Sequence, residues 1–200
     1  METIHKAVLS TTKSLDASLW CDYIYLDTDE RRRFAQASHE YLIEQIQYTG
    51  AESSESQSNK IRMNFNHPIK EIMWVIERDE DSNKNRHFIY SMDEQNEPIT
   101  KAKILLNGHD RITERKGSYF RLVQPYQHHT RIPSKHVYCY SFALKPEDHQ
   151  PSGTCNFSRI DNATLSLDRS SASAAKIKVF AVNYNVLRIM SGMGGLAFSN

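Results

Sequence analysis

Histidines are the residues of this chain best suited to hold a metal or to exchange a proton, and there are nine of them in 200 residues. His128 and His129 are adjacent, so in an extended segment their side chains point to opposite sides. A metal enzyme of the cupin kind needs two histidines one residue apart on a strand, followed by a carboxylate and a further histidine. The sequence contains no such pair, and His136 and His149 have no partner at ligand spacing. We therefore expect ordinary surface and turn histidines and no metal site.

The other common catalytic motifs are missing too. The sequence has no Gly-x-Ser-x-Gly elbow and no His-Glu-x-x-His zinc motif. The glycine-rich stretch 192–195 resembles a phosphate loop, but no Lys-Ser or Lys-Thr follows it, so it predicts a flexible turn that lets backbones approach closely. No pair of carboxylates is singled out for acid–base work. We expect no catalytic residue, no cofactor-binding residue and no enzyme activity.

Composition is that of a folded domain. The 25 Lys and Arg against 24 Asp and Glu give a net charge of +1, so we expect no nucleic-acid partner. The 10 Tyr and 8 Phe exclude a disordered chain. No apolar run approaches the roughly 20 residues of a membrane helix, and residues 1–10 lack the apolar core of a signal peptide. The three cysteines, an odd number with no Cys-x-x-Cys pair, predict reduced thiols in a cytosolic setting: Cys21, Cys139 and Cys155.

Alternation of apolar and polar residues dominates the chain and predicts β-strands. Ile61, Met63 and Phe65, for example, alternate with polar neighbours. Segments 72–76 and 137–144 are apolar on both faces and predict central strands that are covered from both sides. About eight strands in one domain of this size indicate a two-sheet sandwich of the jelly-roll type. The expected ranges are 5–12, 17–27, 59–67, 69–78, 99–107, 135–145, 158–168 and 175–190.

One helix is expected, in an insertion between two strands. Acidic residues 29–30 open it where the helix dipole favours negative charge, the apolar spacing from Phe34 to Ile46 follows one helical face, and Gly50 ends it. The triple arginine 31–33 in its first turn either contacts a phosphate or a partner carboxylate or forms a solvated face.

The long connection 109–135 has an unusual apolar stretch at 119–126. A long loop with apolar residues of its own packs on something, either its own sandwich or a neighbouring molecule. The candidate contacts with a neighbour are Tyr119, Phe120 and Tyr126.

Three long motifs follow one another in a fixed order. The first spans 65–75 and contains Asn-His-Pro, the second spans 140–159 and contains Lys-Pro-Glu-Asp, and the third spans 182–200 and contains Gly-Met-Gly-Gly. These motifs resemble the major capsid proteins of nucleocytoplasmic large DNA viruses, such as iridoviruses. The resemblance spans essentially the whole chain.

The resemblance implies a protein of two consecutive jelly rolls that forms homotrimers of pseudo-hexagonal outline and tiles an icosahedral shell over an internal membrane. Its partners would be copies of itself, neighbouring capsomers and minor capsid proteins, in a virion capsid assembled in the host cytoplasm. We expect no direct membrane insertion. The chain is too short for two rolls, so we expect residues 1–200 to form a single all-β jelly-roll domain, the second roll, with the first absent.

Two turns are expected to have structural roles. The stretch 66–68 predicts a tight corner between two strands, and the stretch 146–153 predicts the turn that leaves the strand before it. Within the second turn, Glu147 and Asp148 either accept backbone N–H groups or pair with Arg159. The turn residues are Asn66, His67, Pro68, Pro146, Pro151 and Gly153.

Two other classes of function remain as alternatives. A carbohydrate- or receptor-binding module can share the jelly-roll architecture, because a fold does not fix a function. That class needs exposed aromatic residues beside Asn or Asp on one set of loops, and Tyr126 with His128 and His129 is the candidate here. A cupin-type enzyme is disfavoured by the missing histidine pair.

Overall fold

The computed structural model describes residues 16–91 and 97–199. The chain divides into two compact units, one made of the residues up to Tyr41 with Leu187–Gly195, the other of Leu42–Val186 with the residues from Leu196 onward. That all 200 residues form a single jelly-roll domain remains a prediction, and the strand predicted at 5–12 lies outside the described residues.

In the first unit, residues 16–27 run without helix or strand, so the strand predicted at 17–27 is wrong. The side chains of Leu19, Trp20 and Ile24 are each 90% exposed. Strand propensity alone does not make a strand, because the backbone needs a partner strand for its hydrogen bonds.

Helix α2 (Thr28–Gln36) begins as predicted, with the Asp27 carboxylate accepting a hydrogen bond from the Glu30 backbone N–H at 2.8 Å. It ends much earlier than Gly50, because residues 39–54 form strand β1 beside strand β9. Exposure along the middle of β1 alternates with period two, and Ile43, with the two glutamines that follow at 45 and 47, is partly buried. The apolar residues whose spacing predicted one face of a helix therefore lie on a strand. Pairing of β1 with the long strand β9 outweighs the helical pattern of the local sequence.

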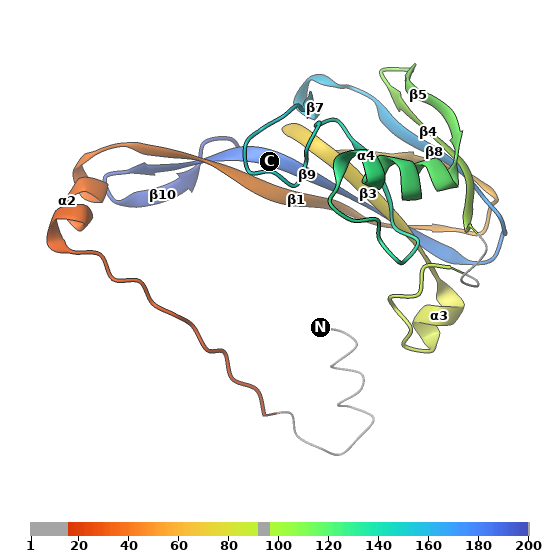
Figure 1. Ribbon diagram of the computed structural model, residues 1–200, viewed down its shortest axis with the longest axis horizontal. Helices are drawn as coiled ribbons and strands as arrows, with labels where there is room; N and C mark the ends of the chain where they lie inside the picture. The colour runs from red at the N-terminus through yellow and green to blue at the C-terminus, as the bar shows by residue number, and fades with distance from the viewer. Residues whose placement is uncertain (1–15, 92–96, 200) are drawn as a thin grey trace. The chain divides into compact units, whose positions relative to one another are not determined.

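The second unit contains a sandwich of two antiparallel sheets (Figure 1). The first sheet has the order β1-β9-β3-β6, with β7 beside β3 and β10 beside β9, and the second has the order β2-β8-β4-β5. Along the chain, β1, β3, β6 and β9 belong to the first sheet and β2, β4, β5 and β8 to the second, which is the crossing pattern of a jelly roll. The predicted all-β jelly roll is confirmed. The strands are β1 (His39–Ser54), β2 (Ser58–Arg62), β3 (Pro68–Arg78), β4 (Ile99–Leu106), β5 (His109–Lys116), β6 (Tyr138–Ser141), β7 (Cys155–Asn156), β8 (Ala163–Arg169), β9 (Ala175–Met190) and β10 (Met193–Leu196).

The core lies between the sheets and follows the alternation of the strands. On β8, Ala163, Leu165 and Leu167 are buried while the residues between them are half-exposed. Trp74 of β3, expected in the core, is completely buried and stacks on Tyr138 of β6 with ring centroids 6.1 Å apart. β3 is buried on both faces, as its apolar sequence predicted.

Predicted and observed strands agree best where alternation is long. β3, β4 and β9 fall within two residues of their predicted ranges, whereas the predicted 135–145 strand shrinks to Tyr138–Ser141. Strand β5 was missed because it is an edge strand with almost every side chain exposed. The signal that could have revealed it is Asn107-Gly108, since both residues have positive φ (51° and 82°) and form the tight hairpin that such pairs favour.

Short helices occupy the long connections. They are α3 (Asp79–Asn83), the π-helix η1 (Tyr119–Val123), α4 (Gln124–His128) and the 3-10 helix η2 (Phe157–Arg159). In the first unit, the glycine-rich turn predicted at 192–195 is a hairpin between β9 and β10, in which Ser191 and Gly192 both have positive φ.

Candidate functional surfaces

The 119–126 segment packs on its own sandwich through Phe120. This ring is fully buried and lies 5.3 Å from the Trp74 ring, centroid to centroid, so its assignment as a subunit contact is corrected. Tyr119 is half-buried, and its hydroxyl accepts a hydrogen bond from Gln124 Nε2 at 2.9 Å. Tyr126, by contrast, is 78% exposed and remains free to meet another molecule.

The corner at 66–68 is held by two segments that are distant in the sequence, one containing Gln47 and one containing Ser158. His67 has a φ of 67°, an uncommon value for a residue with a side chain, and Pro68 begins β3 directly after it. The His67 backbone N–H donates to Ser158 Oγ at 2.8 Å, and the Asn66 backbone N–H donates to Gln47 Oε1 at 3.0 Å. The sequence suggested a rigid corner but not the distant residues that hold it.

The turn at 146–153 depends on close approach of the backbone. Gly153 has a φ of +140°, and a Cβ atom there would lie 2.9 Å from the carbonyl oxygen of Phe142. Ser152 Oγ accepts a hydrogen bond from the Lys145 backbone N–H at 2.9 Å and closes the turn. Pro146 is buried in the same turn, and Pro151 is exposed. A side chain at 153 would therefore clash, whatever its chemistry.

His129 lies between two carboxylates. Its Nε2 atom is 3.0 Å from Glu71 Oε2, and its Nδ1 atom is 3.1 Å from Glu147 Oε1. Interaction with the Cys139 sulfur and with the Glu71 carboxylate raises the pKa of His129 to about 10, although burial acts in the opposite direction. The imidazole is therefore protonated at neutral pH and acts as a structural cation, since a proton carrier needs a pKa near the working pH.

Glu147 has the first of the two roles predicted for it. Its Oε2 atom accepts a hydrogen bond from the Thr130 backbone N–H at 3.0 Å. Hydrogen bonds from Thr130 and His129 lower the pKa of this exposed carboxyl. The sequence did not reveal the link to His129, because the two residues belong to separate loops that the fold brings together.

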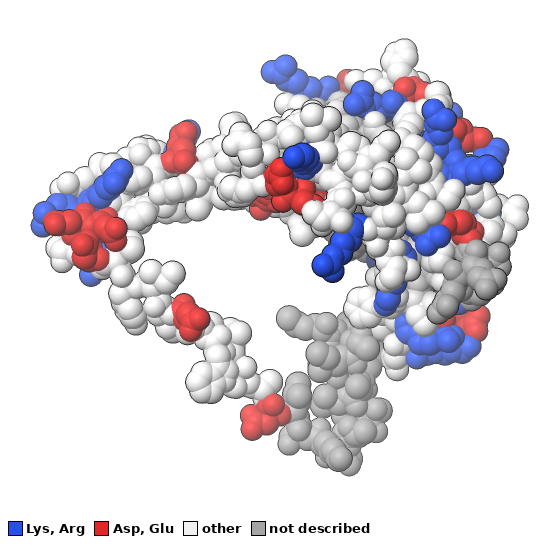
Figure 2. Space-filling model, viewed as in Figure 1, with Lys and Arg blue, Asp and Glu red and all other residues white. Residues whose placement is uncertain are grey.

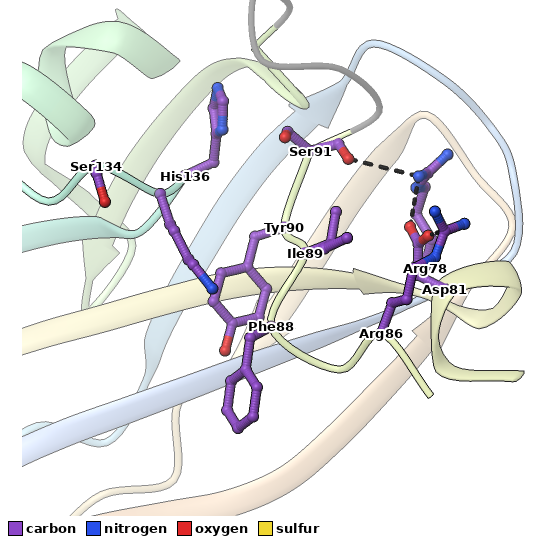
Figure 3. Close-up of a pocket in the computed structure, with 10 residues that line it drawn as sticks. Arg78, Asp81, Arg86, Phe88, Ile89, Tyr90, Ser91, Ser134 and His136 are labelled. Atoms are coloured by element: carbon purple, nitrogen blue, oxygen red, sulfur yellow. Dashed lines mark hydrogen bonds and ion pairs between the residues drawn. The ribbon is translucent and has the colours of Figure 1, made fainter. Parts of the chain in front are cut away.

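A cavity of about 670 Å³ (Figure 3) is lined by Arg78, Asp81, Arg86, Phe88, Ile89, Tyr90, Ser91, Ser134, Lys135 and His136. Asp81, fully buried, forms ion pairs with Arg78 and with Arg86 Nη2, the latter at 2.8 Å. Lys135 Nζ lies 5.7 Å from the centre of the exposed Phe88 ring. Two arginines paired with one buried carboxylate, and a lysine elsewhere in the lining, suit contact with an anion better than acid–base chemistry.

Across 16–91 and 97–199, no group of three or more His, Cys, Asp or Glu side chains is placed to hold a metal ion. In that part of the chain, no helix has the length and apolar character needed to cross a membrane.

These features define a class of protein: an all-β jelly-roll sandwich in which histidines, glycines and prolines fix turns and loops. The family model described as "Large eukaryotic DNA virus major capsid protein" matches residues 30–195. The chain belongs to this family.

Individual relatives agree. The chain is 54% identical to the major capsid protein of Pyramimonas orientalis virus, over 94% of this chain and 50% of that protein. It is 44% identical to the major capsid protein of Paramecium bursaria Chlorella virus 1, over 92% of this chain and 54% of that protein. It thus spans about half the length of the curated relatives it matches.

Solved structures show the same fold. The VP54 protein of PBCV-1, in a crystal structure fitted into a cryo-EM reconstruction of the virophage Sputnik, superposes with a TM-score of 0.77 at 43% identity. The match covers 89% of this chain and 56% of that one. A quasi-atomic model of the PBCV-1 capsid gives a TM-score of 0.74 at 42% identity.

Proposed function

We propose that this chain serves as a structural, non-catalytic subunit of an icosahedral viral capsid, in trimeric capsomers of pseudo-hexagonal outline that tile the outer shell. The observation that carries the proposal is the match in both sequence and fold to PBCV-1 VP54 over 89% of the chain. Its partners would be two further copies, neighbouring capsomers and minor capsid proteins, in a virion assembled in the host cytoplasm.

Exposed apolar side chains support an assembled state. Leu19, Trp20, Ile24 and Tyr25 lie in one extended segment and are each 88–90% exposed. Large apolar side chains left exposed in this way favour contact with other protein, because leaving them in water is unfavourable.

The mass of the purified chain in solution, measured by size-exclusion chromatography with light scattering, tests the trimer. Three copies of a 23.2 kDa chain give about 70 kDa, the closed ring that a capsomer needs. We expect this mass at micromolar concentration. A single species of 23 kDa at every concentration would contradict trimer formation by this chain.

A further inference from the structure

The two sheets of the sandwich differ strongly in charge. The six strands of the first sheet hold five basic and five acidic residues, whereas the four strands of the second hold eight basic and three acidic residues, a net charge of +5. The whole chain has a net charge of only +1. The basic residues of the second sheet are Lys60, Arg62, Lys101, Lys103, Arg111, Arg115, Lys116 and Arg169.

Part of this charge lies on the outer face of the second sheet. Residues that alternate with the buried ones point away from the core, so the outer face is given by the half-exposed positions of β8 and by Lys60 and Arg62 of β2 and Lys101 and Lys103 of β4. Lys and Arg side chains are visible over the region that contains β4, β5 and β8, with a few carboxylates among them (Figure 2).

The strand register places two lysines on either side of a hydroxyl. Lys60 of β2 and Lys103 of β4 both pair with Ser166 of the central strand β8, so the two lysines flank it in one row across three strands. In the next row, Arg62 and Leu105 flank Thr164 in the same way. Neighbouring strands are about 4.8 Å apart, so the small residues of β8 form the floor of a trough about 10 Å wide between long side chains.

A hollow of about 300 Å³ lies at the Thr164 end of this trough and is lined by Lys60, Lys103, Leu105, Gly108, Asn162 and Thr164. Two of the surrounding cations already have carboxylate neighbours: Lys101 Nζ is 2.8 Å from Glu114, and Lys103 Nζ is 3.5 Å from Asp110. Within the part of the chain that the structure describes, Lys60 and Arg62 take part in none of the ion pairs. The side of the trough formed by Lys60 and Arg62 is therefore available to an anion from another molecule.

We propose that this outer face docks a carboxylate-rich surface of a partner protein, with an Asp or Glu side chain held between Lys60 and Lys103 over the Ser166 hydroxyl. The ammonium groups and the hydroxyl can donate hydrogen bonds that a carboxylate accepts. Hydrogen bonds between charged groups are stronger than those between neutral groups. The inference names a partner class for the capsid subunit proposed above and rests on that function.

A protein partner fits this face better than a nucleic acid. Asp110, Glu114 and Asp168 lie on the strands among the lysines and would repel a polymer that carries a charge at every repeat. The four strands of this sheet contain no Phe, Tyr or Trp side chain on which bases could stack. A folded partner can place its carboxylates between these fixed negative charges.

Binding of a fluorescein-labelled octaglutamate peptide, followed by fluorescence anisotropy at low salt, tests the proposal. We expect the double variant Lys60→Glu with Lys103→Glu to weaken binding at least tenfold. The matched control, Arg131→Glu with Lys145→Glu, makes the same change in net charge at exposed residues in other loops, and we expect less than a twofold effect. A third variant, Ser166→Tyr, fills the trough without changing the charge and should weaken binding about fivefold.

Each other result overturns the proposal. Equal losses in the two double variants would show attraction to overall charge rather than to this face. Tighter binding of a single-stranded DNA of the same charge would indicate that the face binds nucleic acid. If the parent chain does not bind the peptide, the face has no acidic protein partner. Circular dichroism checks that each variant is folded. Because peptide binding is measured whatever the mass of the chain, failure here is distinct from failure of the trimer.

Discussion

The two sheets of one sandwich present opposite kinds of outer face. The central strand β3 of the first sheet is buried on both sides, because loop residues cover its outer face: His129 lies against Glu71, and His87 Nδ1 lies 2.9 Å from Glu77. The central strand β8 of the second sheet is buried on alternate residues only, and its other face is open and flanked by lysines. Both are central strands of their sheets, but they differ in what covers them. The covered face of β3 contributes to stability, whereas the open face of β8 is available for contact with another molecule.

The largest effect is expected in the core that both sheets share. Trp74→Ala removes a fully buried ring that contacts Phe120 and Tyr138, and should lower the free energy of unfolding by about 3–5 kcal/mol. Urea denaturation measures it. The control, Ser166→Ala on the open face, should cost less than about 0.5 kcal/mol. A Trp74→Ala loss below about 1 kcal/mol would contradict the packing described.

A matched pair of carboxylates compares the covered and open faces directly. Glu77 is 2% exposed and interacts with Lys178 and His87, whereas the side chain of Glu114 is 52% exposed and pairs with Lys101. Glu77→Gln should lower the free energy of unfolding by about 2 kcal/mol, because it leaves the half-buried Lys178 ammonium without its carboxylate partner. Glu114→Gln should cost less than about 0.5 kcal/mol. Similar losses in chemical denaturation would remove the distinction between the faces.

The environment of Glu77 also predicts that the stability of the fold depends on pH in the acid range. Burial alone would raise the pKa of this carboxyl, but hydrogen bonds from Lys178 and His87 lower it below its ordinary value of 4.5. A lowered pKa in the folded state gives stability that is complete above the unfolded pKa and is lost as the pH falls through the folded one. The parent chain should therefore lose stability below about pH 4.5, and Glu77→Gln should lose less over the same interval.

His129 predicts a loss in the opposite direction. Its folded pKa of about 10 lies above the ordinary 6.5, so the stability it contributes is complete below pH 6.5 and is lost as the pH rises to 10. The whole shift corresponds to about 5 kcal/mol. Because the ring is partly exposed and solvent screens its ion pairs, we expect the free energy of unfolding to fall by on the order of 2 kcal/mol over that interval. His129→Gln should flatten the curve. An NMR titration in which the His129 ring loses its proton near pH 6.5 would refute the assignment.

The smallest effect on folding is expected at the exposed aromatic ring of α4. Tyr126→Ala should change the free energy of unfolding by less than about 0.5 kcal/mol, because the ring is 78% exposed. If Tyr126 lies at a subunit contact, the same variant lowers the mass measured by light scattering. An unchanged mass, together with binding to a glycan array that Tyr126→Ala abolishes, would favour the carbohydrate-binding alternative.

Sequence reasoning succeeded where a pattern extends over many residues. The alternation along β4 and β9 and the apolar run of β3 sufficed to place these strands, because strand geometry fixes the period of burial. It failed between Phe34 and Gly50, where the spacing of apolar residues fits a helix while β1 gains its hydrogen bonds from β9. It also failed for β5, whose polar sequence gives no sign of burial.

The sites show the same division. The positions of both turns followed from Pro68, Pro146 and the Pro-Ser-Gly stretch at 151–153, since proline restricts the backbone locally. The sequence did not reveal whether Phe120 faces a neighbouring molecule or the core, because both places suit an apolar side chain. The structure decided for the core, where the ring meets Trp74.

The sequence alone therefore determined the all-β class, the strands with long apolar alternation, the places where the chain turns and the family. Only the tertiary structure decided which carboxylates meet His129, which face of each sheet is covered, and that Lys60 and Lys103 lie on either side of Ser166. The physical reason is range. The alternation of a strand and the chemistry of a turn depend on residues that are close together in the chain. Ion pairs and strand register join residues that are far apart in the chain, and nothing in the local sequence around one partner identifies the other.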